Sequence, residues 1–324
     1  STAQAADPAW APLNRPGQPL GVAREKLRAS LTCSAGVRDA TVEPVLLTPA
    51  TGVDSKNNFG WNYERLFDME GIPWCASDQF GKRSTNNTNI QVRGEYVVYA
   101  IRKMARMAGR KIAVMGHSQG GMVMRWPLRF WPDTRNLVED VIGMAGTNRG
   151  TTLADGCDPD PCTAADHQQA ASSNFIAALN SRAETFAGIS YTEIYTPIDQ
   201  VVIPQPRASS VAGPGEITNV SIQDVCPNDP NEHLGIGTVS PTAAALALDA
   251  IRNPGPADPA RIDPAVCAQQ LQPGINPATF ATDVAAAAAQ LQTSDAPERP
   301  TEPRLRCYVY KDIGACRKER YGDR

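Results

Sequence analysis

Short apolar runs alternate with longer amphipathic stretches along most of the chain. Apolar runs of the kind that form buried strands occur at residues 42–48, 72–76, 111–115, 137–144, 189–195 and 217–223. Apolar residues at helical spacing occur in residues 61–69, 90–108, 119–130 and 174–186. Because strands that alternate with helices build a parallel sheet covered on both faces, we predict a doubly wound α/β fold.

Two segments interrupt this alternation. Residues 147–173 are rich in Gly, Asp and Pro where a short crossover is expected, and a loop of this length is typical of a lid or a binding loop. The extension 253–324 is rich in Pro and Ala, with a predicted helix at 277–291. Its basic tail from residue 299 we expect to be a solvated surface strap, and the alternative is a binding patch. We treat residues 1–324 as a single domain that carries these two additions.

The composition argues against several classes of protein. Hydrophobic residues make up 42% and charged residues 20% of the 324 residues, which is typical of a chain that buries a core. The 31 basic and 34 acidic residues give a net charge of −3 without long blocks of one sign, so nucleic acid is not an expected partner. No apolar run reaches the roughly 18 residues of a membrane-spanning helix, so we expect no transmembrane segment.

The eight cysteines indicate an oxidising compartment. An even count predicts disulfides, and we therefore expect a secreted protein. The first residues lack the charged start and apolar middle of a signal peptide, as expected if one has been removed. Cys157 and Cys162 could form half of a metal site, but with only three histidines in the chain a disulfide is favoured and no metal is expected. Closeness in sequence also favours Cys307 with Cys316, and the other pairings stay open.

Gly116-His-Ser-Gln-Gly120 matches the pattern Gly-x-Ser-x-Gly. It follows the predicted strand 111–115 and precedes a predicted helix, which is the context of a nucleophile elbow. Such a turn is so tight that the residues two positions before and two positions after the serine must be glycine. It also places the serine at a helix N-terminus, whose dipole favours negative charge. We therefore predict that Ser118 is a nucleophile.

A serine hydroxyl needs a general base, nearly always a histidine, and the chain offers three. His117 is the neighbour of Ser118 and its side chain should point away, while His167 lies in the predicted lid. Only His233, in a loop after the predicted strand 217–223, leaves room for the order serine, acid, histidine of the α/β-hydrolases. We predict His233 as the base.

The acid that orients the base should follow a strand between the serine and the histidine. Asp199 does so after the predicted strand 189–195, and we expect it to hold the imidazole tautomer. Other carboxylates either crowd the lid or lie too near His233 in sequence. They are Asp155, Asp158, Asp160 and Asp166 in the lid and Asp224 and Asp229 before His233, while Glu193 and Asp224 are the alternatives if Asp199 is not the partner.

The tetrahedral intermediate of acyl transfer needs hydrogen-bond donors for its oxyanion. The backbone N–H of Gln119, next after the nucleophile, is one candidate. The loop after an early strand should supply the other, and Thr51 in Pro-Ala-Thr-Gly lies there. Thr51 could also donate its hydroxyl, and the alternative is that it is only a turn residue.

Together these motifs resemble the Candida antarctica lipase B-like family of secreted α/β-hydrolases. The residues that carry the resemblance are 30–33, 44–52, 118–120, 126, 130–132, 194–199 and 225–226 ahead of His233. The resemblance implies the α/β-hydrolase fold and a lipase or esterase without a cofactor, with the triad Ser118, Asp199 and His233 and the oxyanion residues Thr51 and Gln119. It also implies the disulfides Cys33–Cys75, Cys226–Cys267 and Cys307–Cys316, which leaves Cys157 with Cys162.

Three further positions concern the substrate. The family has tryptophan at the position of His117, where it floors a pocket that sorts alcohols, so that selectivity does not carry over to this chain. The resemblance places Val201 and Val202 in the acyl or alcohol channel. We expect His117, Val201 and Val202 to border the substrate.

We therefore expect a secreted, monomeric serine carboxylic-ester hydrolase that acts on ester or lipid substrates, including those at a lipid–water interface. One alternative is an esterase of small or polymeric esters, or an acyltransferase, with the same triad. Another is a non-catalytic binding protein, since the same fold serves many functions.

Overall fold

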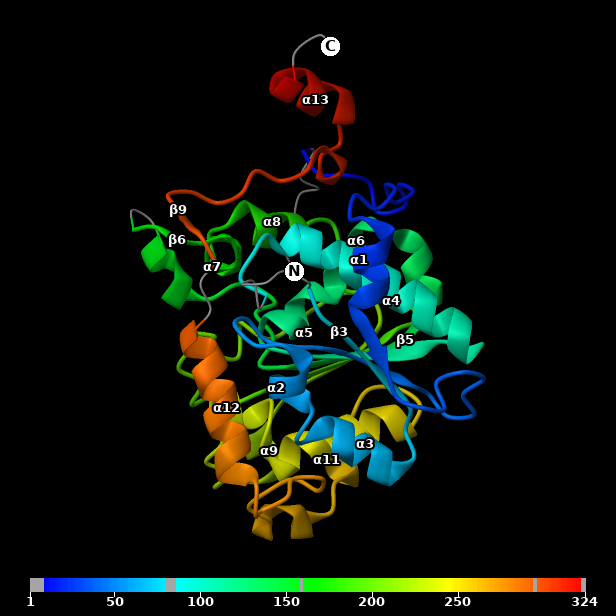
Figure 1. The fold of residues 1–324 in the computed structure, drawn as a ribbon, viewed down its shortest axis with the longest axis vertical. Coiled ribbons are helices and arrows are strands. Elements are labelled where there is room, and N and C mark those ends of the chain that lie inside the picture. Colours follow the sequence, from blue (N-terminus) through cyan, green and yellow to red (C-terminus); the bar gives the residue numbers. More distant parts are fainter. Residues whose placement is uncertain (1–8, 80–85, 158–159, 294–295, 322–324) are drawn as a thin grey trace.

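A seven-stranded sheet lies at the centre of the fold (Figure 1). The structure is a computed structural model that describes residues 9–79, 86–157, 160–293 and 296–321. The strands lie in the order β1-β3-β2-β4-β5-β7-β8, and of these only β1 runs antiparallel to its neighbour. Their bounds are Leu31–Cys33 (β1), Val45–Thr48 (β2), Trp74–Ser77 (β3), Ile112–His117 (β4), Val138–Met144 (β5), Ser190–Tyr195 (β7) and Glu216–Ser221 (β8).

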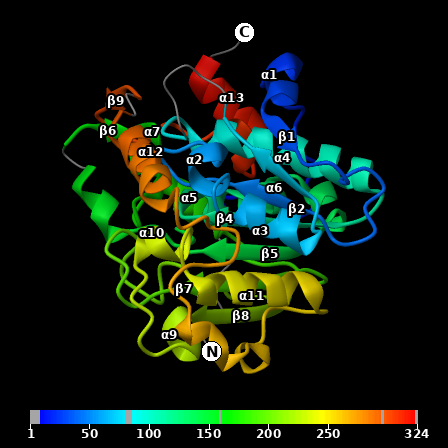
Figure 2. The same ribbon diagram turned by 60° about the horizontal axis from the view of Figure 1, so that its bottom comes forward.

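Helices cover both faces of the sheet (Figures 1 and 2). Helices α4, α6 and α8 pack on one face, where Trp126 and Phe175 belong to a buried cluster, and α3 and α11 pack on the other, around Phe67 and Leu246. Because side chains alternate along a strand, β4 contributes to both clusters. These helices are Tyr63–Glu70 (α3), Ile90–Ala108 (α4), Arg125–Phe130 (α6), Asn174–Leu179 (α8) and Pro241–Arg252 (α11). The predicted doubly wound arrangement is confirmed.

Local signals explain why α4 begins and ends where the pattern predicts. The Asn89 side chain accepts a hydrogen bond from the backbone N–H of Gln91 and so caps the first turn. Gly109 ends the helix with φ 67°, a left-handed conformation that glycine adopts without strain. Between these two residues α4 buries a broad apolar face against the sheet.

Other predicted elements have different bounds. The predicted helix 119–130 divides at Met124 into α5 (Gln119–Val123) and α6. The predicted helix 174–186 ends at Leu179. The predicted strand 217–223 ends at Ser221, because Ser221 and Asp224 form a capping box that begins α9 (Ile222–Val225).

The remaining elements are short or lie outside the central sheet. They are α1 (Arg24–Ala29), α2 (Ser55–Phe59), β6 (Cys162–Thr163), α7 (Ala164–Gln169), α10 (His233–Ile236), α12 (Phe280–Thr293), β9 (Glu298–Arg299), α13 (Ile313–Tyr321) and 3₁₀ turns at Pro132–Asn136, Thr152–Cys157, Pro259–Arg261, Pro264–Ala268 and Cys307–Val309. The predicted lid 147–173 thus contains a 3₁₀ turn, β6 and α7 rather than a plain loop, and β6 pairs with β9.

Part of the C-terminal tail is buried in the core of the protein. Leu305 and Val309 are 2% and 0% exposed and join the core on the α4 face. The backbone N–H of Lys311 donates to the carbonyl oxygen of Ala9 at 2.8 Å, so the tail also pairs with the N-terminal segment. The expectation of a merely solvated strap was therefore wrong, because these apolar side chains gain free energy by leaving water.

All eight cysteines form disulfides. The pairs are Cys33–Cys75, Cys157–Cys162, Cys226–Cys267 and Cys307–Cys316. Cys33 and Cys75 are paired residues of β1 and β3, and Cys226 follows α9. These are the pairings expected from the sequence and from the resemblance.

One helical stretch of the described residues, His233–Arg252, has the length and hydropathy of a membrane span. Of its most apolar window, 72% is buried inside the protein. The stretch contains α10 and α11, and α11 packs its alanines on the sheet. A buried core helix meets the same criteria of length and composition, so this stretch is only weak support for a membrane span.

Two carboxyl groups, of Glu43 before β2 and Asp140 on β5, lie close enough to influence each other's pKa. Burial raises the pKa of both groups, and the neighbouring Asp140 charge raises that of Glu43 further. The pair therefore holds a proton at neutral pH.

Candidate active site

Ser118 lies in a tight turn between β4 and α5. Its backbone has φ 56° and ψ −122°, a strained conformation for a residue with a side chain. A Cβ on Gly116 would come within 2.3 Å of the carbonyl carbon of Gly120, and one on Gly120 within 1.9 Å of the carbonyl oxygen of Thr48. Both positions therefore require glycine, as the Gly-x-Ser-x-Gly pattern predicts.

His233 and Asp199 lie beside this serine. His233 begins α10 after the N-cap residue Glu232, and Asp199 lies in the loop after β7. The distance from His233 Nε2 to Ser118 Oγ is 3.1 Å, and that from His233 Nδ1 to Asp199 Oδ2 is 2.9 Å. All three residues are buried. The structure thus brings together the serine, the histidine and the carboxylate that the sequence singles out.

Asp199 is held by more than the histidine. Its Oδ1 accepts hydrogen bonds from the backbone N–H groups of Val201 and Val202, both at 2.8 Å. Burial alone would raise the pKa of Asp199, but the hydrogen bond and charge of His233 and the two amides outweigh burial and lower it. An ionised Asp199 accepts the Nδ1–H of His233, which leaves Nε2 to accept the proton of Ser118.

The other two histidines make structural contacts. The Nε2–H of His117 donates to the carbonyl oxygen of His233 at 2.9 Å, and His117 Nδ1 lies 3.3 Å from Nδ2 of Asn58. Burial, with the nearby His233 adding to it, lowers the pKa of His117 to about 3, so the ring is neutral. His167 Nε2 lies 2.8 Å from the carbonyl oxygen of Arg299 and so joins α7 to β9.

Two of the alternative carboxylates are bonded to other groups. Asp224 accepts the backbone N–H of Ser221 in the capping box of α9, and Asp229 accepts the hydroxyl of Thr242. Asp158 lies outside the described residues. None of the described alternatives is bonded to His233: Asp155, Asp160, Asp166, Asp224, Asp229 and Glu193.

Thr51 and Gln119 approach each other beside the serine. Thr51 follows β2 in a turn, and Gln119 is the first residue of α5, where a backbone N–H has no acceptor inside the helix. Gln119 Nε2 donates to Thr51 Oγ1 at 3.0 Å, and Nε2 of Gln169 in α7 donates to the same oxygen at 3.1 Å. Thr51 lines the same cavity as Ser118, and Gln119 directly follows Ser118 in the chain. That these two residues form an oxyanion hole stays a prediction.

A cavity of about 740 Å³ opens on Ser118 and His233. Much of its wall is apolar and comes from α12, from the predicted lid and from the segment after Asp199: Leu153, Val201, Val284, Ala288 and Leu291. His117 and Val202 also border it, although Val202 is only 1% exposed. That these residues touch a substrate stays a prediction.

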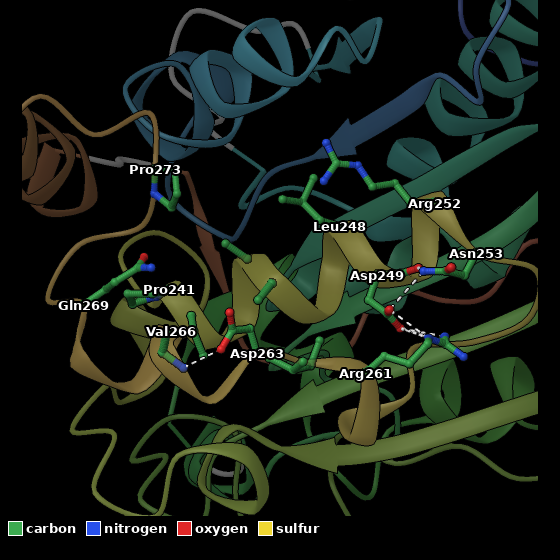
Figure 3. A pocket seen from close by; sticks show the side chains of 14 residues that line it. Pro241, Leu248, Asp249, Arg252, Asn253, Arg261, Asp263, Val266, Gln269 and Pro273 are labelled. Atoms are coloured by element: carbon green, nitrogen blue, oxygen red, sulfur yellow. Dashed lines mark hydrogen bonds and ion pairs between the residues drawn. The ribbon is translucent and has the colours of Figure 1, made fainter.

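A smaller cavity of about 340 Å³ lies between α11 and the segment that follows it (Figure 3). Leu248 and Val266 line it, and Arg261 reaches across to Asp249 with a contact of 2.6 Å. None of its lining residues is a serine, a cysteine or a histidine. It therefore lacks the serine or cysteine and the histidine that a nucleophile–base pair of this kind needs.

Sequence reasoning missed three residues around the site. Asn58 links the Ala50 backbone N–H to His117, Gln169 donates to Thr51, and Arg93 of α4 donates to the side chain of Gln119. Apart from Ala50, which is 8 residues from Asn58, their partners lie at least 26 residues away in the sequence, so no local motif identifies them. The one available signal was an arginine in the apolar pattern of the predicted helix 90–108.

Comparison with known proteins finds lipases. The model of the family Lipase (class 2) matches residues 77–239, which contain Ser118, Asp199 and His233. Lipase B of Pseudozyma antarctica is 32% identical over 208 residues, which are 62% of this chain and 59% of that protein. The crystal structure of Aspergillus fumigatus lipase B matches with a TM-score of 0.80 and 27% identity, over 94% of this chain and 76% of that chain. These likenesses confirm the α/β-hydrolase fold.

Proposed function

Because the class 2 lipase model spans half of its residues, the chain belongs to the class 2 lipase family, and we propose that it hydrolyses carboxylic esters through an acyl-enzyme on Ser118. The observation that carries the proposal is the hydrogen-bonded series from Ser118 through His233 to Asp199 at the wall of an apolar cavity. The likeness to lipases of named activity adds support.

In the first step Ser118 Oγ attacks the ester carbonyl carbon, and its proton moves to Nε2 of His233. The imidazolium that forms keeps its Nδ1–H on Asp199, whose negative charge stabilises it. The oxyanion forms near α5, whose N-terminal dipole and the Gln119 backbone N–H favour negative charge there. The hydroxyl and backbone N–H of Thr51 are the complementary donors.

In the second step the tetrahedral intermediate collapses and the alkoxide leaves with the proton from His233 Nε2. Water then takes the place of the alcohol. The water attacks the acyl carbon and gives a proton to His233 Nε2. His233 then returns this proton to Ser118 Oγ as the carboxylic acid leaves. The two steps need no redox group or metal in their atom balance.

The lining of the cavity favours apolar acyl chains. Large apolar side chains are exposed around its mouth: Leu153 is 58%, Leu234 50%, Val284 40%, Leu291 39% and Val201 37% exposed. Scattered single apolar residues are ordinary on a surface, but a group around one opening marks an interaction site. We propose lipid-like esters as the substrate, reached at a lipid–water interface.

The four disulfides support an extracellular location, because such bonds persist in oxidising compartments. Secretion is part of the proposal, as is a monomeric state.

The test combines labelling with a substrate series. A fluorophosphonate should label the wild type and should not label Ser118→Ala, in which the nucleophilic oxygen is absent. Rates on p-nitrophenyl esters from acetate to palmitate, with an emulsified triglyceride alongside, measure the acyl preference. No labelling and no ester turnover by the folded wild type would reject an enzyme and leave a binding protein on this fold. Turnover confined to short soluble esters would reject only the lipid-like substrate.

A further inference from the structure

A buried arginine lies behind the turn that carries Thr51. Arg93 of α4 is 2% exposed, and its two terminal nitrogens donate to Oε1 of Gln119 and to the carbonyl oxygen of Pro49. Both acceptors are neutral, and within the described residues no carboxylate forms an ion pair with this guanidinium. Burying a cation without a countercharge is costly, so its position calls for an explanation.

The hydrogen bonds continue from Arg93 to the proposed oxyanion site in one direction. Arg93 donates to Oε1 of Gln119, and Nε2 of the same amide donates to Thr51 Oγ1 at 3.0 Å and to the carbonyl oxygen of Asn86 at 2.9 Å. Gln169 Nε2 also donates to Thr51 Oγ1, at 3.1 Å. An amide NH₂ can only donate, so the Thr51 oxygen accepts twice and its own proton stays free for the oxyanion.

Each donor in this series polarises the next one. A hydrogen bond in a low-dielectric interior is strengthened when its donor group itself accepts a bond, and most of all when the first donor is charged. Burial lowers the pKa of Arg93 to about 9, with Asp78 acting in the opposite sense, so the guanidinium is protonated at neutral pH. The positive charge of Arg93 therefore polarises the Gln119 amide, and this amide in turn polarises the Thr51 hydroxyl.

We infer that Arg93 is a positioning residue for the oxyanion hole, which orients the Gln119 amide and so polarises the Thr51 hydroxyl. The inference rests on the proposed ester hydrolysis and adds to it a residue that touches no substrate. The second arm of Arg93, on Pro49, holds the start of the turn 49–52 that carries Thr51. An oxyanion hole acts through donors fixed in advance, so a group that fixes them contributes to the rate.

The test is a double-mutant cycle with Thr51. Arg93→Met should lower kcat by about tenfold or more with little change in KM, because oxyanion donors act on the transition state. Thr51→Val, which keeps the shape and removes the hydroxyl, should lower kcat by about a hundredfold. In the Thr51→Val background Arg93→Met should cost less than about threefold, since the group on which it acts is gone.

A transition-state analogue gives a second readout. A trifluoromethyl ketone forms a tetrahedral adduct with the serine, so its inhibition constant should rise in Arg93→Met by the same factor as kcat/KM falls. Arg129→Met is the matched control, because Arg129 is 1% exposed on α6 and binds Ser181 and the Ala11 carbonyl instead. It should lower the melting temperature and leave kcat within about twofold.

Gln119→Met keeps the test open if Arg93→Met does not fold. This variant retains the backbone N–H and Arg93 but removes the carboxamide between Arg93 and Thr51, so it should also lose kcat and be non-additive with Thr51→Val. Losses that multiply in both cycles, or a Gln119→Met enzyme with wild-type kcat, would overturn the inference while the wild type still hydrolyses esters. A wild type without turnover would instead reject the proposed function.

Discussion

Asp199→Asn tests the triad most directly, because the geometry around this carboxylate determines how an amide must sit there. Oδ1 of Asp199 accepts the backbone N–H groups of Val201 and Val202 at 2.8 Å, and Oδ2 accepts Nδ1–H of His233. In the variant, the amide oxygen of the new side chain would keep the two backbone bonds. Its NH₂ group would then face Nδ1 of His233, so Nδ1 must become an acceptor and Nε2 must carry the proton.

The size of the effect follows from the alternative orientation. If the introduced amide turned round to accept Nδ1–H, it would leave the buried N–H groups of Val201 and Val202 unpaired. Each unpaired donor costs about 1–3 kcal/mol, so the active tautomer lies about 2–6 kcal/mol above the inactive one. The loss of the carboxylate charge beside the imidazolium adds to this. We expect kcat to fall by about 10³–10⁴, equivalent to about 4–5.5 kcal/mol.

The assay is kcat/KM on p-nitrophenyl butyrate, with the melting temperature measured to show that the variant is folded. Asp155→Asn, an isosteric change of a lid carboxylate that is not bonded to His233, is the control and should keep wild-type turnover. Asp199→Asn combined with His233→Ala should be hardly worse than His233→Ala alone, because residues that act as a unit are non-additive. A loss below about tenfold, or losses that multiply, would refute the assignment of Asp199 as the partner of His233.

Three further predictions concern the cysteines and the pH dependence of stability. Thiol titration of the denatured, unreduced protein should find no free thiol, and replacing Cys33 and Cys75, which are 42 residues apart, by serine should cost about 4 kcal/mol in urea unfolding. Replacing Cys157 and Cys162, which are 5 residues apart, by serine should lower the free energy of unfolding by about 2 kcal/mol, because this disulfide closes a shorter loop. An equal loss for both disulfides would contradict the loop argument. Burial raises the pKa of Glu43 above its ordinary value of 4.5. Above pH 4.5 the folded state therefore binds more protons than the unfolded state, so the free energy of unfolding should fall as pH rises. The slope is at most about 1.4 kcal/mol per pH unit, and Glu43→Gln should reduce it in urea unfolding between pH 5 and 8; an unchanged slope would show that Glu43 is ionised in the fold.

The sequence by itself was enough to predict the features that depend on residues close together in the chain. The tight turn at Ser118 is encoded in five consecutive residues. Steric crowding requires glycine at positions 116 and 120, and both lie within two residues of the serine. Helix α4 has its cap, its apolar period and its terminal glycine within one segment, so both its ends were predicted. The order of strands and helices was also sufficient for the doubly wound fold.

Where local signals compete, the sequence pattern was less accurate. The apolar run 217–223 has the composition of a strand throughout, but the capping box of Ser221 and Asp224 ends the strand and starts a helix. The apolar residues of the C-terminal tail were too few to predict burial, and only the fold supplied the hydrophobic surface on which Leu305 and Val309 pack.

The tertiary structure alone decided how the site is assembled. The sequence singled out Asp199 and His233 through the order of the family's residues, but their distance from each other and from Ser118 is set by three separate loops at the sheet edge. Arg93 lies 26 residues from Gln119 and could be linked to it only once α4 packs behind the turn. Backbone geometry and periodicity act over a few residues and are written in the local sequence, whereas hydrogen bonds between buried side chains exist only after distant segments have packed together.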